Sequence, residues 1–210
     1  MASFLLNSSK LKAGDRALLV FFPGLHFMAS LIACFKAGII AIPVFPPDPR
    51  RLQKDLHHFI SIQDSSGAVV ALTHNLYNFA KKVSDIQGIF KSKSLKWPEL
   101  RWISVDDVLA RGKEKASTPG AGPPLPSPPM SDEIAFLQYT SGSTSEPKGV
   151  MISHGNLSHN LTLITRELKA DKATVNVSWL PQYHDMGLIG KTMLSRGSVV
   201  NACYFISPTL

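Results

Sequence analysis

The stretch "DRALLVFFPGLHFMASLIACFKAGIIAIPVF", residues 15–45, decides the fold class. Residues 15–22 form a short, mostly apolar run, which is typical of a buried strand. Residues 23–38 open with Pro-Gly, close with Gly38 and carry apolar residues on more than one face, and so predict a buried helix. Residues 39–45 predict a second strand, stopped by the prolines that follow. A strand, a helix and a strand within about thirty residues make a βαβ unit, with parallel pairing and a right-handed crossover.

The alternation continues along the chain. Helices are expected over 50–66, 74–90, 154–168 and 185–196, and strands over 68–73, 101–105, 133–140, 174–180 and 198–207. This order predicts an α/β fold with a largely parallel sheet. Residues 110–132 are rich in Pro, Gly, Ser and charge and predict a solvated loop. A docking segment for a partner domain is the other interpretation of its "PPLPSPP" run.

Composition narrows the function classes. The chain has 210 residues, of which 44% are hydrophobic and 18% charged, a balance typical of a globular domain. The net charge is +7, but no nucleic-acid-binding module accompanies it, so we expect no nucleic-acid partner. No apolar run is long enough to span a bilayer, and the opening residues lack the core of a signal peptide. Cys34 and Cys203 lie in apolar runs without metal or disulfide spacing, which favours buried thiols and an intracellular, cytoplasmic protein.

The segment "YTSGSTSEPKGV", residues 139–150, is the candidate site of chemistry. A loop rich in Gly, Ser and Thr that directly follows a buried strand can offer backbone N–H groups, hydroxyls and one lysine to a phosphate. The orders of a Walker P-loop and of a Rossmann fingerprint are both absent. The other interpretation is a surface loop without a ligand.

The segment "YTSGSTSEPKGVMISHGNL" resembles the phosphate-loop signature of the adenylate-forming superfamily, which includes acyl-CoA synthetases, luciferases and nonribosomal-peptide adenylation domains. Downstream, "VSWLPQYHDMGLIG" (177–190) resembles the next motif of that superfamily. This motif, together with "AIPVFPPDP" (41–49), is most similar to fatty acyl-AMP ligases and their relatives fused to polyketide synthases. The resemblance covers residues 10–207, nearly the whole chain.

The resemblance implies an ATP-dependent ligase. A fatty acid carboxylate would attack the α-phosphate of ATP and give an acyl-adenylate and pyrophosphate, with coenzyme A or an acyl carrier protein as the acceptor. Magnesium would bridge the phosphates and be held by residues outside this chain. The β- and γ-phosphates would be bound by Thr140, Ser141, Gly142, Ser143, Thr144 and Lys148.

The second motif supplies the other candidate residues. By resemblance, His184 would lie at the mouth of the acyl pocket, near the carboxylate and the α-phosphate; a structural histidine that orients a loop is the alternative. Met186 and Gly187 would line the acyl channel, and a place in the ordinary core is their alternative. We expect Asp185 to cap the helix that starts there.

Other residues limit these expectations. Ser145 replaces the glycine that is usual in the family's loop, which weakens the expected nucleotide affinity if that position needs a positive φ. His154 and Asn156 are expected to be structural. His57 and His58 are neighbours in sequence and do not face one another, so no metal site is expected.

The resemblance also sets the domain organisation. Residues 1–210 are expected to be an incomplete N-terminal domain, with a first α/β segment over 10–109, the loop 110–132 and a site segment over 133–210. The C-terminal domain and the adenine, ribose and magnesium motifs are expected elsewhere in a larger multidomain protein. The chain alone is therefore expected to be inactive. The alternatives are a non-catalytic nucleotide- or acyl-binding module and an interaction protein that retains the fold.

Overall fold

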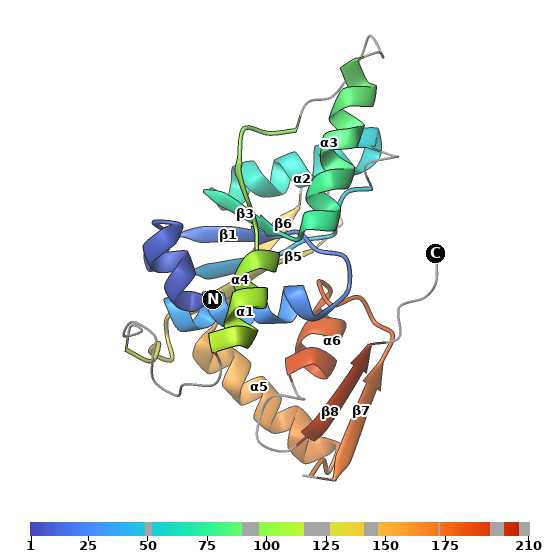
Figure 1. Ribbon diagram of the computed structural model, residues 1–210. Coiled ribbons are helices and arrows are strands. Elements are labelled where there is room, and N and C mark those ends of the chain that lie inside the picture. Colours follow the sequence, from blue (N-terminus) through green and yellow to red (C-terminus); the bar gives the residue numbers. More distant parts are fainter. Residues whose placement is uncertain are drawn as a thin grey trace.

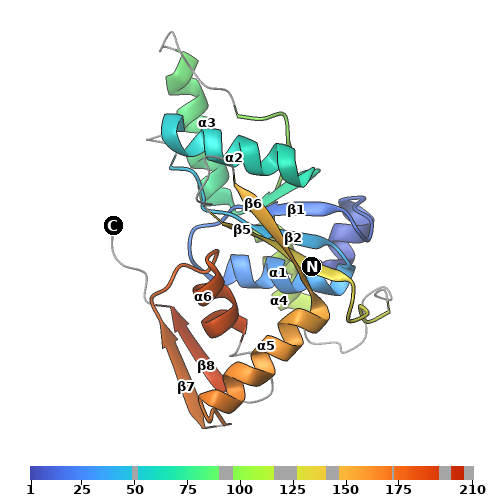
Figure 2. The ribbon, with the colours of Figure 1, turned by 180° about the vertical axis from the view of Figure 1, so that it is seen from behind.

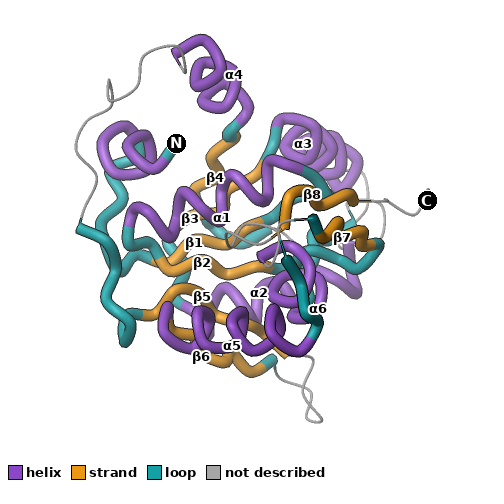
Figure 3. The backbone as a smooth tube through the Cα atoms, turned by 90° about the horizontal axis from the view of Figure 1, so that it is seen from below, coloured by secondary structure: helices purple, strands orange, loops and turns teal. Residues whose placement is uncertain are grey.

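The computed structural model describes residues 1–48, 52–89, 97–115, 127–140, 147–171, 173–193 and 200–205. Its centre is a six-stranded sheet in the order β4-β3-β1-β2-β5-β6, which Figure 3 shows from below. The strands are β1 (Arg16–Leu19), β2 (Ile40–Pro43), β3 (Val70–Thr73), β4 (Arg101–Ser104), β5 (Ile134–Thr140) and β6 (Lys148–Ser153). Neighbouring strands are parallel except β5 and β6, which form an antiparallel pair. The predicted α/β class with a largely parallel sheet is therefore confirmed.

Helices cover both faces of this sheet (Figures 1 and 2). One face carries α1 (Leu25–Ala37), α4 (Asp106–Lys115) and α5 (His154–Glu167), and the other carries α2 (Leu52–Ser66) and α3 (Asn75–Ile89). The chain leaves β1 for β2 on one side and then returns across β1 to β3, so right-handed crossovers place α1 and α2 on opposite faces.

The βαβ unit of residues 15–45 forms as the sequence predicts. Gly24 stands at the N-cap of α1, and Gly38 ends the helix in the left-handed conformation, with φ 67°. The Gly38 N–H points back to the carbonyl oxygens of Cys34 and Phe35, a common way to close a helix with glycine. Arg16–Leu19 then pair in register with Ile40–Pro43.

Two hydrophobic clusters fill the space between sheet and helices. The first lies between the sheet and α1 and α5, with Leu19, Phe27, Leu31, Phe136 and Leu157 among its members. The second lies under α2 and α3, with Leu18, Ile42, Phe59, Tyr77 and Trp97. Because β1 contributes Leu19 to one cluster and Leu18 to the other, the apolar run that predicted a buried strand is explained by burial on both faces.

A smaller part of the molecule lies beside α5, below the main sheet in Figure 1. It contains a parallel pair of strands, β7 (Thr174–Ser178) and β8 (Val200–Phe205), the short helix α6 (Asp185–Gly187) and the π-helical turn η2 (Leu188–Met193). The strand predicted over 174–180 ends at Ser178. Residues 194–196 of the predicted helix 185–196 lie outside the described residues.

Three elements differ from the sequence prediction. The π-helical turn η1 (Phe4–Ser8) was not expected. The helix α4 extends to Lys115, so the loop predicted over 110–132 is wrong over residues 110–115. Asp106 and Asp107 occupy the first turn of α4, where carboxylates favour helix formation. The chain after Lys148 forms β6 before α5 starts; since most residues of β6 are exposed, it has no apolar alternation to reveal it.

No helix in the described part of the chain is both long and apolar enough to cross a membrane.

Candidate functional site

The candidate phosphate loop connects the two strands of the β5–β6 hairpin. Thr140 ends β5 and Lys148 begins β6, and the two residues pair in register. Both side chains are exposed, and Lys148 makes no ion pair within the described ranges, so its charge is available to an anion. Ser141, Gly142, Ser143 and Thr144, with Ser145, lie outside the described residues. The hairpin therefore brings both ends of the loop together at the carboxyl edge of the parallel strands, where open α/β sheets bind ligands.

The end of the hairpin next to the loop is fixed by a contact that the sequence did not reveal. Tyr139 pairs with Gly149, and a β-carbon on Gly149 would lie 2.9 Å from Cζ of the tyrosine ring. The ring covers the glycine, and the Tyr139 hydroxyl makes a 2.8 Å hydrogen bond with the hydroxyl of Ser65 on α2. A glycine opposite an aromatic residue in a hairpin is the signal that could have indicated this packing.

His184 lies at the start of the second candidate segment. It is the N-cap residue of α6, its side chain is 68% exposed, and Nδ1 lies 2.5 Å from Oδ1 of Asp185. Asp185 also accepts a hydrogen bond from the Met186 N–H at 2.6 Å. The predicted cap is therefore wrong: Asp185 is the first residue of the helix, and the N-cap is His184, whose side chain makes no capping hydrogen bond. Met186 is 66% exposed, which removes ordinary core as its explanation, whereas Gly187 is buried.

The turn before His184 is tight. The His184 N–H donates to the carbonyl oxygen of Pro181 at 3.1 Å, and the Leu188 N–H donates to the carbonyl oxygen of His184 at 2.7 Å. A β-carbon at Gly187 would collide with the Pro181 carbonyl oxygen, so only glycine fits there. The backbone of this turn, not the exposed imidazole, determines where His184 stands.

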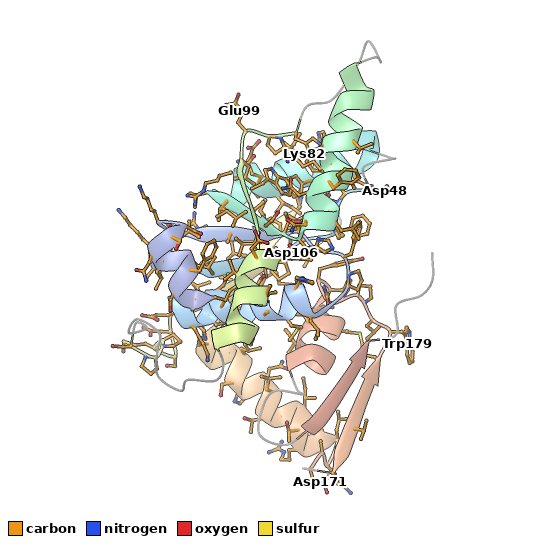
Figure 4. All side chains as sticks on the ribbon, viewed as in Figure 1. Asp48, Lys82, Glu99, Asp106, Asp171 and Trp179 are labelled. Atoms are coloured by element: carbon orange, nitrogen blue, oxygen red, sulfur yellow. The ribbon has the colours of Figure 1, made fainter. Side chains whose placement is uncertain are left out.

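The turn is attached to the main sheet from two strands. Nε2 of Gln138 on β5 donates to the carbonyl oxygen of Tyr183 at 3.2 Å. The Tyr183 ring packs edge-to-face on Phe45, which follows β2, with 5.4 Å between ring centres. Gln182 is fully buried, and sequence reasoning assigned it no role. Trp179 lies on the outer side of this region, 70% exposed, as Figure 4 shows.

A histidine pair at the same edge of the sheet was also missed. His74 directly follows β3, is buried, and packs against the rings of Phe22 and His26 at 5.3 and 5.7 Å. Burial lowers the pKa of His74, and the nearby His26 lowers it further. Asp106, at the centre of Figure 4, lies 3.6 Å from His26 Nε2 and accepts the Asn75 N–H at 2.7 Å. These contacts join the starts of α1, α3 and α4.

The remaining expectations concern structural residues. Ser153 and Asn156 form a reciprocal capping box at the start of α5, and His154 packs edge-to-face on Phe35 at 5.4 Å, so both predicted structural roles are confirmed. Cys34 is buried, and burial raises the pKa of its thiol to about 12, as expected of an inert cysteine. The side chain of Cys203 is outside the described residues. Among the residues that the structure describes, no group of His, Cys, Asp or Glu could hold a metal ion.

Comparison with known proteins identifies the family of this chain. The family model described as AMP-binding enzyme matches residues 1–202, so this chain belongs to that family. The fold is that of the N-terminal domain of adenylate-forming enzymes, as the resemblance in the sequence predicted.

Individual members of the family show which enzymes this chain is similar to. The chain is 36% identical over 194 residues to a medium-chain-fatty-acid–[acyl-carrier-protein] ligase of Moorena producens, covering 92% of this chain and 30% of the relative. A ligase of the same description from Teredinibacter turnerae is 34% identical, with 87% and 32% covered. The fatty acyl-adenylate ligase of L. pneumophila, solved with acyl adenylate and pyrophosphate, superimposes with a TM-score of 0.74 at 33% identity, covering 99% and 32%. The chain thus spans about a third of the length of the relatives that it matches.

Proposed function

We propose that this chain is the part of a fatty acid ligase that binds the triphosphate of ATP and receives the fatty acid carboxylate. A carboxylate oxygen forms a bond to the α-phosphorus, the bond from that phosphorus to the β-bridging oxygen breaks, and pyrophosphate leaves with the electron pair. The observation that carries the proposal is the β5–β6 hairpin, with the exposed Lys148 beside its loop and the His184 turn bound to β5 through Gln138.

The residues have separate roles in this step. Thr140 and Lys148 stand at the two ends of the loop, so they bind the β- and γ-phosphates together with Ser141, Gly142, Ser143 and Thr144. The Lys148 ammonium stabilises the charge that builds on the departing pyrophosphate. His184 donates a hydrogen bond to the reacting oxygens, and Met186 and Gly187 border the acyl chain. Magnesium would supply positive charge that stabilises the phosphates, and residues outside this chain would hold it.

The acceptor and the setting are part of the same proposal. The names of the relatives from Moorena producens and Teredinibacter turnerae give an acyl carrier protein as the acceptor, which supports a carrier protein over coenzyme A here. Because the chain spans about a third of these relatives, we infer that activity belongs to a longer, multidomain cytoplasmic protein and that the 210-residue chain alone is inactive.

Pyrophosphate exchange tests the function. The 210-residue chain and the longest protein that carries this sequence are assayed for fatty-acid-dependent exchange of labelled pyrophosphate into ATP. We expect exchange with the longer protein and none with the 210-residue chain. K148M should reduce it at least about tenfold, since a charge-assisted phosphate contact is lost. K82M on α3, where Figure 4 labels the exposed Lys82, is the matched control and should leave exchange unchanged. A longer protein without such exchange would refute the proposal, and exchange by the 210-residue chain would refute its inactivity.

A non-catalytic binding module is the second candidate. Ser145 favours it, because a side chain at a loop position that is usually glycine can crowd a triphosphate. This candidate predicts that ATP binds to the longer protein, measured by calorimetry, while no fatty acid promotes pyrophosphate exchange.

A further inference from the structure

Gln182 joins two segments that are far apart in sequence. The Gly24 N–H donates to its Oε1 at 3.0 Å, and its Nε2 donates to the carbonyl oxygen of Phe22 at 3.3 Å. These partners are 158 and 160 residues away, in the connection between β1 and α1. The side chain is fully buried, and both ends of its amide are satisfied by these backbone groups.

Gln138 holds the same turn from the other side. It lies on β5 two residues before Thr140, is 8% exposed, and donates from Nε2 to the carbonyl oxygen of Tyr183. Its Oε1 is buried without a partner among the described groups, so the amide is oriented by the single bond to Tyr183. Two buried amides thus hold one turn: that of Gln182, within the turn, binds the β1–α1 connection, and that of Gln138, on the strand that enters the phosphate loop, binds the carbonyl oxygen of Tyr183.

The side chain of His184 has no comparable anchor. It is exposed, and among the residues that the structure describes its side chain makes a polar contact only with its neighbour Asp185, which moves with it. Its place in the molecule therefore depends on the backbone from Pro181 to His184. That backbone is held by the contacts of Gln182 and Tyr183.

We propose that Gln182 and Gln138 are positioning residues that fix the Pro181–His184 turn beside the β5–β6 hairpin, and so set His184 relative to Thr140 and Lys148. This inference rests on the proposed function, which gives His184 its role. The chemistry needed is an amide: the acceptor faces an N–H and the donor faces a carbonyl oxygen, and an apolar side chain of equal length can serve neither. A role in filling space alone would be met equally well by methionine.

Hydrogen exchange in the 210-residue chain, read by mass spectrometry, tests the link without nucleotide. Q182M should raise exchange roughly tenfold or more in peptides over both 20–26 and 180–188, because two buried hydrogen bonds are lost. Q138E should raise it over 180–188 only, when its carboxylate cannot donate to Tyr183. Q63E is the matched control, since the half-buried Gln63 on α2 makes no side-chain hydrogen bond with any described residue.

Q182E adds a readout that space filling would not produce. A neutral carboxyl can accept from Gly24 and donate to Phe22, whereas a carboxylate cannot donate. Exchange relative to the unaltered chain should therefore be close to normal at low pH and raised at high pH in both segments. At high pH the ring signals of His184 in NMR spectra should also differ from those of the unaltered chain at the same pH, and Q63E should show neither effect.

The outcomes separate the inference from the function. Unchanged exchange in Q182M, or a change confined to 20–26 with His184 signals unmoved, would overturn the positioning role. Failure of the proposed function appears instead as absent pyrophosphate exchange in the longer protein, and does not affect the hydrogen-exchange result. If both stand, Q182M in the longer protein should lower kcat for exchange while KM for ATP stays the same.

Discussion

Gly187 shows how far a single residue can determine the site. A β-carbon there would meet the carbonyl oxygen of Pro181, whereas one on Gly190, three residues further on, would meet nothing within 4 Å. G187A should therefore lower the free energy of unfolding by roughly 1–3 kcal/mol, because the turn before His184 must open. G190A should be neutral or slightly stabilising, since alanine favours a helix over glycine. Urea unfolding of the two variants checks this, and equal effects would contradict it.

His74 makes stability depend on pH. Its pKa in the folded chain lies below the ordinary value of 6.5, chiefly through burial and then through the charge of His26, with Asp106 opposing. The unfolded chain therefore binds the proton more readily, so this contribution is complete above pH 6.5 and is lost as the pH falls below it.

H74F keeps a ring among Phe22, His26 and Tyr77 but removes the titration. Its free energy of unfolding should fall less between pH 7 and pH 5 than that of the unaltered chain, as chemical denaturation at several pH values would show. Some slope should remain, because burial also lowers the pKa of His154. H57Q, at an exposed position on α2, should keep the full slope; if H74F keeps it too, the assignment to His74 is wrong.

Single residues of the site were predictable only where a local pattern marks them. Thr140, Lys148 and His184 stand in contiguous motifs. The structure pairs Thr140 with Lys148 and bonds the turn before His184 to the strand of Thr140, although their roles remain predictions. Gln182 could not be recognised, because its partners lie 158 and 160 residues away and nothing near it in sequence indicates them. The same holds for Tyr139, whose hydroxyl partner is on α2.

Among the elements, α5 has the clearest local signal for where a helix begins. Ser153 accepts a hydrogen bond from the Asn156 N–H at 3.1 Å, and the Asn156 side chain accepts one from the Ser153 N–H at 3.1 Å. S153A should cost about 1 kcal/mol of unfolding free energy, the usual effect of removing an N-cap. S158A, at an exposed position inside the same helix, should be neutral. Thermal unfolding followed by circular dichroism would decide, and a neutral S153A would mean that β6 alone fixes the start of α5.

Element prediction succeeded where burial and caps act together. The strands β1, β2 and β3 carry apolar runs because both faces are covered, and α1 ends at a glycine with φ 67°. It failed for β6, which is held by pairing with β5 and not by its own pattern. The prediction also failed for the end of α4, because charged residues are typical of a loop but also support an exposed helix.

At the scale of the whole molecule, one sheet serves two cores. Leu31 of α1 is fully buried in the cluster on one face, while Trp97 and Trp102 pack around Phe59 on the other, at ring distances of 5.8 and 6.0 Å. The three strands β1, β2 and β3 between them are only four residues long, so neither face retains a surface to pack on once the other is lost. We therefore expect the two faces to unfold together.

L31A tests this cooperativity from the far side of the sheet. It should cost roughly 2–5 kcal/mol through the lost contacts and the remaining cavity. In a W179F background, which removes the exposed tryptophan, fluorescence reports Trp97 and Trp102 alone. Their unfolding transition should shift to lower urea by as much as the transition seen by circular dichroism, although neither ring touches α1. L25A, which alters a 76% exposed leucine of the same helix, should shift neither signal. If L31A moved only the circular dichroism transition, the α2–α3 face would be stable on its own, and the sheet would not couple that face to the strand that carries Gln138.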